Sequence, residues 1–386
     1  MRLLKPLPFL VLSILFAALP AIAGEKAPKP RDSPQPPSYT LPPEEREPLR
    51  VYRSLESSGP DWGVIRLKVP DVWASGNEGA GVKVAVLDTG IDSNHPDLKS
   101  HIASPDDVKD FTGSRFGATD KQGHGTHCAG TILASGRLPG VAPKAGLIAG
   151  KVLGDNGSGG VDGISTGITW AIARNADVIS MSLGGPGSDT WIPPTLKAAE
   201  EAGVIVVAAA GNEGPGANSC GYPGQYPQCI TVAAVGRTGE SDGLGVAGFS
   251  SRCPAVYVAA PGVAVQSTWP GGQYATISGT SMATPHVAGL AALWVAANPN
   301  VPKKERPKKF REALKAACVD LAPSGRDTAT GWGFPDAAKL AAIAPTIPQP
   351  MPRGVLIGWD DLSDSAKSRL RGQGVDAFKF ELILKP

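Results

Sequence analysis

The sequence carries little net charge. Its 37 Lys and Arg residues oppose 35 Asp and Glu residues, which leaves a formal charge of +2. A nucleic-acid-binding domain needs a clustered basic face, and the one basic run, residues 303–309, is interrupted by Pro307. We therefore expect no nucleic-acid partner, and we interpret this run as a solvated surface loop.

Long apolar runs are missing beyond the N-terminus. A membrane-spanning helix needs about 20 consecutive apolar residues, and the apolar stretch at residues 7–19 is shorter. Arg2 and Lys5 precede this stretch and small residues up to Ala23 follow it, which is typical of a secretory signal peptide (residues 1–23). No cysteine follows for attachment of a lipid. We expect a secreted protein, extracellular or periplasmic, with no membrane contact after the signal is removed.

Cysteine is scarce, with five residues in the whole chain. Export permits disulfides, and an odd number leaves at least one thiol free or paired with another chain. Cys220 and Cys229 close a short loop that contains Pro and Gly, and we favour them as a pair. The spacing alone does not fix the connectivity among Cys128, Cys220, Cys229, Cys253 and Cys318.

Large apolar residues are sparse in residues 24–60, which are rich in Pro, Glu and Ser. Such a segment cannot bury enough surface to fold alone, so we interpret it as a linker or a short pro-segment. Residues 61–344 show apolar runs and helical patterns, which predict one large domain. The next residues are again rich in Pro, so residues 345–386 are expected to be a linker and a C-terminal extension.

Within the large domain, continuous apolar runs alternate with helical patterns. The runs predict buried strands at residues 82–87, 145–152, 177–182 and 204–210, and the helical patterns lie at 124–134, 161–175, 195–203 and 280–297. This alternation predicts an α/β fold of three layers, with a mostly parallel central sheet and helices on both faces. Active sites in such sheets gather at the carboxyl ends of strands, where Asp88, Ser182 and Asn212 stand.

Asp88 and His124 are the candidate acid and base. Asp88 ends the first predicted strand, which would hold its carboxylate rigidly against an imidazole N–H, whereas Asp92 lies further into the turn. His124 begins a predicted helix among small residues. His124 and His127 also have a spacing that suits a metal pair, but no Glu or third His stands near them in sequence, so we favour the base over a zinc site.

Ser281 is the candidate nucleophile. Gly279 before it and apolar residues after it predict a turn that enters a buried helix. A Ser at this position often only caps the helix, but the positive end of the helix dipole also favours an oxyanion. Asn212 follows a predicted strand and either makes an Asx-turn or donates its side-chain amide to that oxyanion together with the Ser281 N–H.

The segments around Asp88, His124 and Ser281, in this order, closely resemble the subtilisin family of serine proteases, with a tilt toward the proteinase K branch. The resemblance covers about residues 62–340 and makes 61–344 a subtilisin-like peptidase domain. It implies a serine endopeptidase that hydrolyses polypeptides through an acyl-enzyme, as a monomer and with no cofactor for its chemistry. Cys128 resembles the buried free cysteine of proteinase K-like members.

The resemblance also implies a substrate-binding surface. Two edge segments would pair with the main chain of an extended peptide, and a pocket with glycine at its base would accept large apolar or aromatic side chains. Broad specificity is expected, with a narrow processing protease as the alternative. The implied residues are Gly157, Ser158, Gly159, Gly160, Ser182, Leu183, Gly184, Gly185, Ala210, Gly211 and Gly221.

The sequence departs from the family at its calcium sites and its pro-segment. Asp97 matches one family ligand, but the loop at residues 134–139 that would complete the site is short, and Tyr257 replaces an Asp of a second site. Asp97 is therefore a weak calcium candidate, and we expect little dependence on calcium. Residues 24–60 are too few for a folded pro-domain. A silent relative that only binds peptides is a further alternative, although such a protein usually lacks one of the four site residues.

Overall fold

The structure is a computed structural model that describes residues 38–40, 50–52, 58–239, 243–321, 323–343 and 367–368. The predicted signal peptide at 1–23 lies outside these residues, as do most of the predicted linker at 24–60 and of the predicted extension at 345–386. Among the helices of the described ranges, none is both long enough and apolar enough to cross a membrane.

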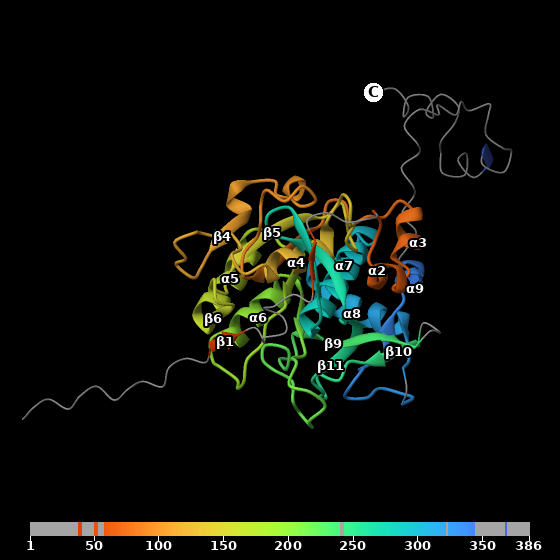
Figure 1. Ribbon diagram of the computed structural model, residues 1–386. Coiled ribbons are helices and arrows are strands. Elements are labelled where there is room, and N and C mark those ends of the chain that lie inside the picture. Colours follow the sequence, from red (N-terminus) through yellow and green to blue (C-terminus); the bar gives the residue numbers. More distant parts are fainter. Residues whose placement is uncertain are drawn as a thin grey trace, which may run out of the picture. The chain divides into compact units, whose positions relative to one another are not determined.

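The centre of the domain is an eight-stranded sheet in the order β10–β9–β8–β7–β3–β5–β4, with β11 beside β9 (Figure 1). Pairing is parallel from β4 through β9 and between β9 and β11, whereas β10 is antiparallel to β9. This sheet confirms the predicted α/β fold. Its strands are β3 (Lys83–Asp88), β4 (Val108–Asp110), β5 (Gly146–Lys151), β7 (Val178–Met181), β8 (Ile205–Ala209), β9 (Cys229–Thr238), β10 (Gly243–Val246) and β11 (Val256–Pro261).

Helices cover both faces of this sheet. Successive residues of a strand point to opposite faces, and in β3 Val84 and Val86 join one core while Ala85 and Leu87 join the other. The first core includes α4 and α7, and the second includes α5 and α6, which lie together in Figure 1. The helices are α2 (Trp62–Arg66), α3 (Val69–Ala74), α4 (His124–Leu133), α5 (Val161–Ala173), α6 (Ile192–Glu201), α7 (Thr280–Ala297), α8 (Arg306–Ala317) and α9 (Ala337–Ile343), with short 3₁₀ turns η1 (Lys99–His101), η2 (Pro105–Asp107) and η3 (Lys303–Glu305).

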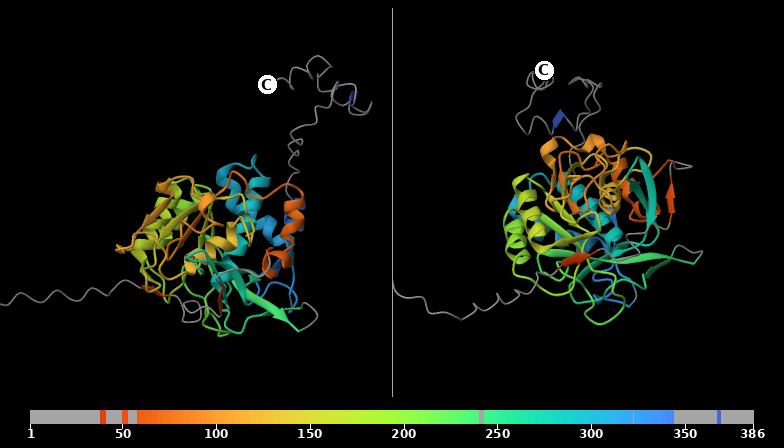
Figure 2. Two further views of the ribbon diagram at one scale, coloured as in Figure 1. Left: turned by 45° about the horizontal axis from the view of Figure 1, so that its top comes forward. Right: turned by 60° about the vertical axis from the view of Figure 1, so that its left-hand side comes forward.

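Two short strands from the predicted linker pair with strands of the domain. β1 (Ser38–Thr40) is antiparallel to β6 (Ser158–Gly160), and β2 (Arg50–Tyr52) is antiparallel to β13 (Gln273–Ile277), which also pairs with β12 (Val265–Trp269). The right-hand view of Figure 2 shows β2, in orange-red, beside the teal β13. A further pair joins β14 (Cys318–Val319) to β15 (Phe334–Pro335). Each linker strand is three residues long and depends on a partner in the domain, so composition did not predict it.

The prediction of a surface loop at residues 303–309 is wrong. η3 leads directly into α8, which begins at Arg306 and has Pro307 in its first turn. Proline is tolerated there because the first N–H groups of a helix have no intrahelical acceptor. The opposite face of α8 places Phe310 and Leu314 in the core. Lys308 and Lys309 therefore lie on the exposed side of an amphipathic helix, whereas Arg306 forms an ion pair of 2.7 Å with Asp177.

The expected Cys220–Cys229 pair is also wrong. Cys220 is bonded to Cys253, and the two Cα atoms are 5.8 Å apart. Cys220 and Cys253 lie in the core that contains α4 and α7, whereas Cys229 opens β9 and lies in the core on the opposite face of the sheet. Cysteines on opposite faces of a sheet cannot meet the geometry of a disulfide. Cys128, Cys229 and Cys318 have free thiols.

Candidate active site

Asp88, the predicted acid, is the last residue of β3 and is 1% exposed. Its Oδ1 accepts a hydrogen bond of 2.7 Å from the Thr89 N–H and lies 2.8 Å from Nδ1 of His124. β3 is held between the parallel strands β5 and β7 in the middle of the sheet. The predicted acid and base are therefore in direct contact, and the acid stands on a rigid strand.

His124, the predicted base, is the first residue of α4 and is fully buried. The turn before it requires glycine, because Gly123 has a φ of 108° and a Cβ there would lie 2.3 Å from the Trp269 ring. Burial disfavours the imidazolium, but the interactions with Asp88 and Cys128 together outweigh burial and raise the pKa of His124 well above its ordinary value. Because Nδ1 faces Asp88, Nε2 is the ring nitrogen on the opposite side.

Ser281, the predicted nucleophile, is the second residue of α7 and is 3% exposed. Its hydroxyl donates to the Ser182 carbonyl at 3.2 Å, and its own carbonyl accepts from the Ser182 hydroxyl at 2.8 Å. The Ser281 N–H is among the first of the helix, where the N–H groups point out of the positive end of the dipole. This position suits an oxygen that becomes negative during a reaction.

Asn212 lies just past the end of β8 and contacts the start of α7. Its Oδ1 accepts from both the N–H and the hydroxyl of Thr280, each at 2.9 Å. These two bonds orient the side-chain amide, so that Nδ2 points away from Thr280. The Thr280 Oγ1 in turn accepts from the Gly211 N–H at 3.1 Å. Sequence reasoning missed Thr280 as an orienting residue, although its place directly before Ser281 was a signal.

The predicted substrate-binding residues form two groups. Gly157 and β6 supply one edge, with Ser158, Gly159 and Gly160 in the strand. The other group includes Leu183. In this group, Gly185 exchanges two main-chain hydrogen bonds of 3.0 Å with Tyr222, and the Gly221 N–H donates to the Ala210 carbonyl at 2.9 Å. A Cβ at Gly221 would lie 3.6 Å from the Cα of Gly184. The structure thus brings together Ser182 to Gly185, Ala210, Gly211 and Gly221 beside Ser281.

Cys128 lies close to both the base and the nucleophile. Its Sγ is 3.8 Å from Nδ1 of His124 and 3.6 Å from the carbonyl oxygen of Ser281. Burial raises the pKa of the Cys128 thiol to about 11, and a neutral thiol is a poor nucleophile. Asp88, His124 and Cys128 are the one group of three neighbouring metal-ligand side chains in the part of the chain that the structure describes. His127 is not in this group, and its Nε2 contacts the Val265 carbonyl at 3.1 Å.

Asp97, the weak calcium candidate, contacts the short loop and β13. Its Oδ2 accepts from the Tyr274 hydroxyl at 2.9 Å and from the Leu138 N–H at 3.4 Å. A Cβ at Gly136 would lie 2.1 Å from the Asp97 Oδ1, so the loop closes directly onto the carboxylate. Tyr257 donates its hydroxyl to the Arg311 carbonyl at 2.7 Å. Weak dependence on calcium stays a prediction.

Comparison with known proteins gives a consistent picture. The model of the Subtilase family matches residues 79–333. Subtilisin amylosacchariticus of Bacillus subtilis subsp. amylosacchariticus is 45% identical over 246 residues, which are 62% of this chain and 61% of that relative. A subtilisin of Bacillus sp. (strain TA39) is 40% identical over 319 residues and 75% of each chain. The solved structure of sphericase is 38% identical, with a TM-score of 0.64, and the match covers 72% of this chain and 99% of that one.

Proposed function

The chain belongs to the subtilase family, and from this premise we propose that it is a serine endopeptidase that hydrolyses polypeptides. The observation that carries the proposal is the contact of 2.8 Å between Asp88 and His124, with Ser281 at the start of α7. The chain spans about 61% of the length of the first relative it matches, so the activity rests on this chain's own residues as well as on kinship.

In the proposed reaction, Ser281 attacks the peptide carbonyl and His124 accepts the proton of its hydroxyl. Asp88 holds the imidazole in the required tautomer and stabilises the imidazolium. The Asn212 amide and the Ser281 N–H donate to the oxyanion. His124 then protonates the leaving amine, and water hydrolyses the acyl-enzyme by the same steps. As in other subtilisins, these steps need no cofactor.

We propose that substrate binds as an added strand along β6. The pairing of β1 with β6 supports this, because Tyr39 stands opposite Gly159 in antiparallel register and a substrate in extended conformation would pair in the same way. Ser182 to Gly185 form the second edge, and the glycine at position 221 leaves room for large apolar or aromatic side chains. Cleavage of a peptide library distinguishes this broad preference from a narrow processing specificity.

We propose that the protein is secreted and acts as a monomer, with residues 61–344 as the peptidase domain. The N-terminal pattern at residues 1–23 and the disulfide between Cys220 and Cys253 support export. Cys128, buried beside His124, supports a tilt toward the proteinase K branch. Mass spectrometry of the secreted protein would identify both termini, and size-exclusion chromatography its oligomeric state.

The test of the activity is covalent labelling and substitution of the nucleophile. A fluorophosphonate probe is expected to label Ser281, and Ser281→Ala is expected to lower kcat by about 10⁶-fold. Ser278→Ala is the matched control, because its hydroxyl only accepts from the Ala264 N–H at 2.8 Å. Undiminished proteolysis by the Ser281→Ala variant contradicts the proposal. Turnover of casein by the parent protein excludes a relative that only binds peptides.

A further inference from the structure

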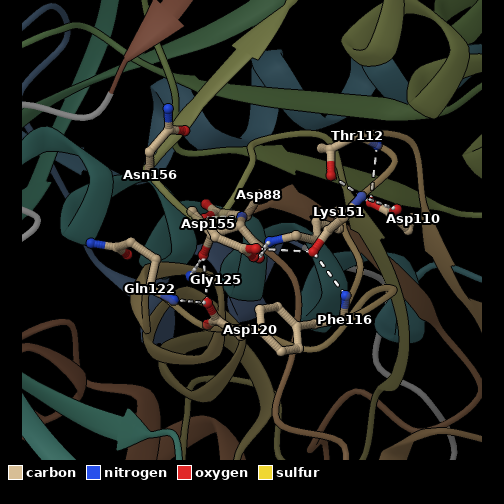
Figure 3. Close-up of polar contacts among 12 residues, drawn as sticks. Asp88, Asp110, Thr112, Phe116, Asp120, Gln122, Gly125, Lys151, Asp155 and Asn156 are labelled. Atoms are coloured by element: carbon tan, nitrogen blue, oxygen red, sulfur yellow. Dashed lines mark hydrogen bonds and ion pairs between the residues drawn. The ribbon is translucent and has the colours of Figure 1, made fainter.

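Lys151 is a long charged side chain that is 0% exposed, and the proposed reaction does not use it. It ends β5, in register with Asp88 on β3 and with Asp110 on β4. A buried ammonium is costly unless it is paired. Its Nζ donates to the Thr89 carbonyl and forms an ion pair of 3.1 Å with Oδ1 of Asp155 (Figure 3). A cation therefore lies next to the strand end that carries the acid.

Thr89 links this cation to both the acid and the base helix. Its N–H donates to Oδ1 of Asp88 at 2.7 Å, and its hydroxyl donates to Oδ1 of Asp120 at 2.9 Å. The same hydroxyl accepts from the N–H of Gly125, the second residue of α4, at 2.9 Å. The Lys151 ammonium thus holds Thr89, which is bonded both to the end of β3 and to the start of α4.

Asp120 extends this network along the start of α4. Its buried carboxylate accepts from the Gln122 N–H at 3.1 Å and from the Gly123 N–H at 2.7 Å. It also accepts from the N–H and the hydroxyl of Thr126, at 2.9 and 2.7 Å. Because the turn before α4 is bonded to Asp120, a movement of Thr89 would move both catalytic partners relative to each other.

Asp155 balances the charge of Lys151. It lies in the turn before β6, and its Oδ2 accepts from the Ser114 hydroxyl at 3.0 Å. Partial burial works in the opposite direction, but the hydrogen bonds from Lys151 and Ser114 hold the pKa of Asp155 below its ordinary value. Asp110, opposite Lys151 on β4, accepts instead from Thr112 and from the Ser114 N–H. Asp155 is thus the carboxylate that pairs with the buried ammonium.

We propose that Lys151 is a positioning residue that orients Asp88 through Thr89, and that the Lys151–Asp155 pair balances the charge felt by His124. The inference rests on the proposed function. The ammonium opposes protonation of His124, and the Asp155 carboxylate offsets part of that field. Several charged or titratable groups face this assembly. They are Asp88 from β3, Asp110 from β4, Asp120 from the turn before α4, Cys128 and His127 from α4, and Asp155 and Arg115 from the loops.

The experiment measures kcat and KM against pH for the full chain on an uncharged peptide substrate. Lys151→Met keeps an unbranched side chain that is one atom shorter and removes its charge, so kcat is expected to fall about tenfold while KM changes less than about twofold. The acid limb of the profile is the pH range in which activity falls because His124 becomes protonated. It should move upward by about half a pH unit, because the Asp155 carboxylate without its ammonium partner stabilises the imidazolium of His124. Asp155→Asn should move it downward by a similar amount, and the double variant should lie between the two.

Lys197→Met is the matched control, because it removes an exposed cation on α6 that pairs with Glu201. Its acid limb should not move. The proposal is overturned if a folded Lys151→Met variant keeps the parent profile, or if the two substitutions move the acid limb in the same direction. Should Lys151→Met fail to fold, Asp155→Asn decides, and an unmoved acid limb overturns the proposal.

Failure of the proposed function would look different. The parent protein itself would then neither hydrolyse the peptide nor react with the fluorophosphonate probe, and both proposals would fall. If the parent is active and the Lys151 and Asp155 variants behave like it, only the role of Lys151 is lost.

Discussion

The two sides of the candidate active site are built from different chemical groups. The acid–base side holds charged groups, of which Asp120 and Lys151 are buried and Asp155 is exposed. The nucleophile side consists of hydroxyls, one amide and main-chain groups. The residues concerned are Asp120, Lys151 and Asp155 around Asp88 and His124, and Ser182, Asn212 and Thr280 around Ser281. Charges shift a proton equilibrium, whereas neutral dipoles stabilise a developing oxyanion without a competing ion nearby. Each side therefore suits one half of the proposed chemistry.

Among the substitutions proposed in this comparison, Asp88→Asn on the charged side should cause the largest loss of activity. The amide is nearly isosteric but neutral, so it neither fixes the tautomer of His124 nor stabilises the imidazolium. We expect kcat to fall by about 10⁴-fold, measured by steady-state hydrolysis of a peptide. Asp92→Asn is the control, because the Asp92 carboxylate accepts from the N–H groups of Asn94 and Gly271. A larger loss in the control would mean that the acid is misassigned.

Asn212→Ala should weaken the neutral side without affecting the proton equilibrium. Removing one donor to the oxyanion is expected to lower kcat by about 10²- to 10³-fold. Thr280→Val keeps the N–H bonded to Asn212 and removes only the hydroxyl, so its loss should be smaller, about tenfold. The same pH series used for Lys151 should give both variants the acid limb of the parent. A shifted acid limb would mean that the neutral side also affects the protonation of His124.

The parts of the fold that the sequence predicted are those with a local signal. The four predicted strands end within one residue of β3, β5, β7 and β8, because burial on both faces makes each a continuous apolar run. Asp88, His124, Ser281 and Asn212 stand at the end of such a strand or at the start of a helix, where Gly and small residues mark the turn. Their contacts match that placement.

Residues whose roles depend on distant partners were not predicted. Thr89 and Asp120 are 31 positions apart, and Lys151 reaches back 62 positions to the Thr89 carbonyl. The only hint was a lone cation inside the predicted strand at 145–152. The partner of Cys220 was missed for a related reason, since the sheet separates Cys229 from it and the short spacing did not reveal that.

The smallest expected effect concerns stability in acid, where the two sides should behave alike. His127 on α4 and His286 on α7 are both fully buried, and burial lowers their pKa values to about 3 and about 4 from 6.5. Below pH 6.5 the unfolded chain therefore binds these protons and the folded chain does not. The contribution of the two neutral histidines to the free energy of unfolding is fully present above pH 6.5. It is lost as pH falls toward 4, by about 1.4 kcal/mol per pH unit for each histidine.

The single variants His127→Gln and His286→Gln should each lower the slope of the unfolding free energy against pH by the amount that one histidine contributes. The measurement is the free energy of unfolding in urea between pH 4.5 and 6.5, in a Ser281→Ala background that prevents self-digestion. The slope matters rather than the absolute stability, because each substitution also removes a hydrogen bond to the carbonyl of Val265 or Met282. Equal changes are expected, because both folded-state pKa values lie below the pH range of the measurement. A smaller change for His127 would contradict the lowering of its pKa by burial and by the neighbouring His124 on α4.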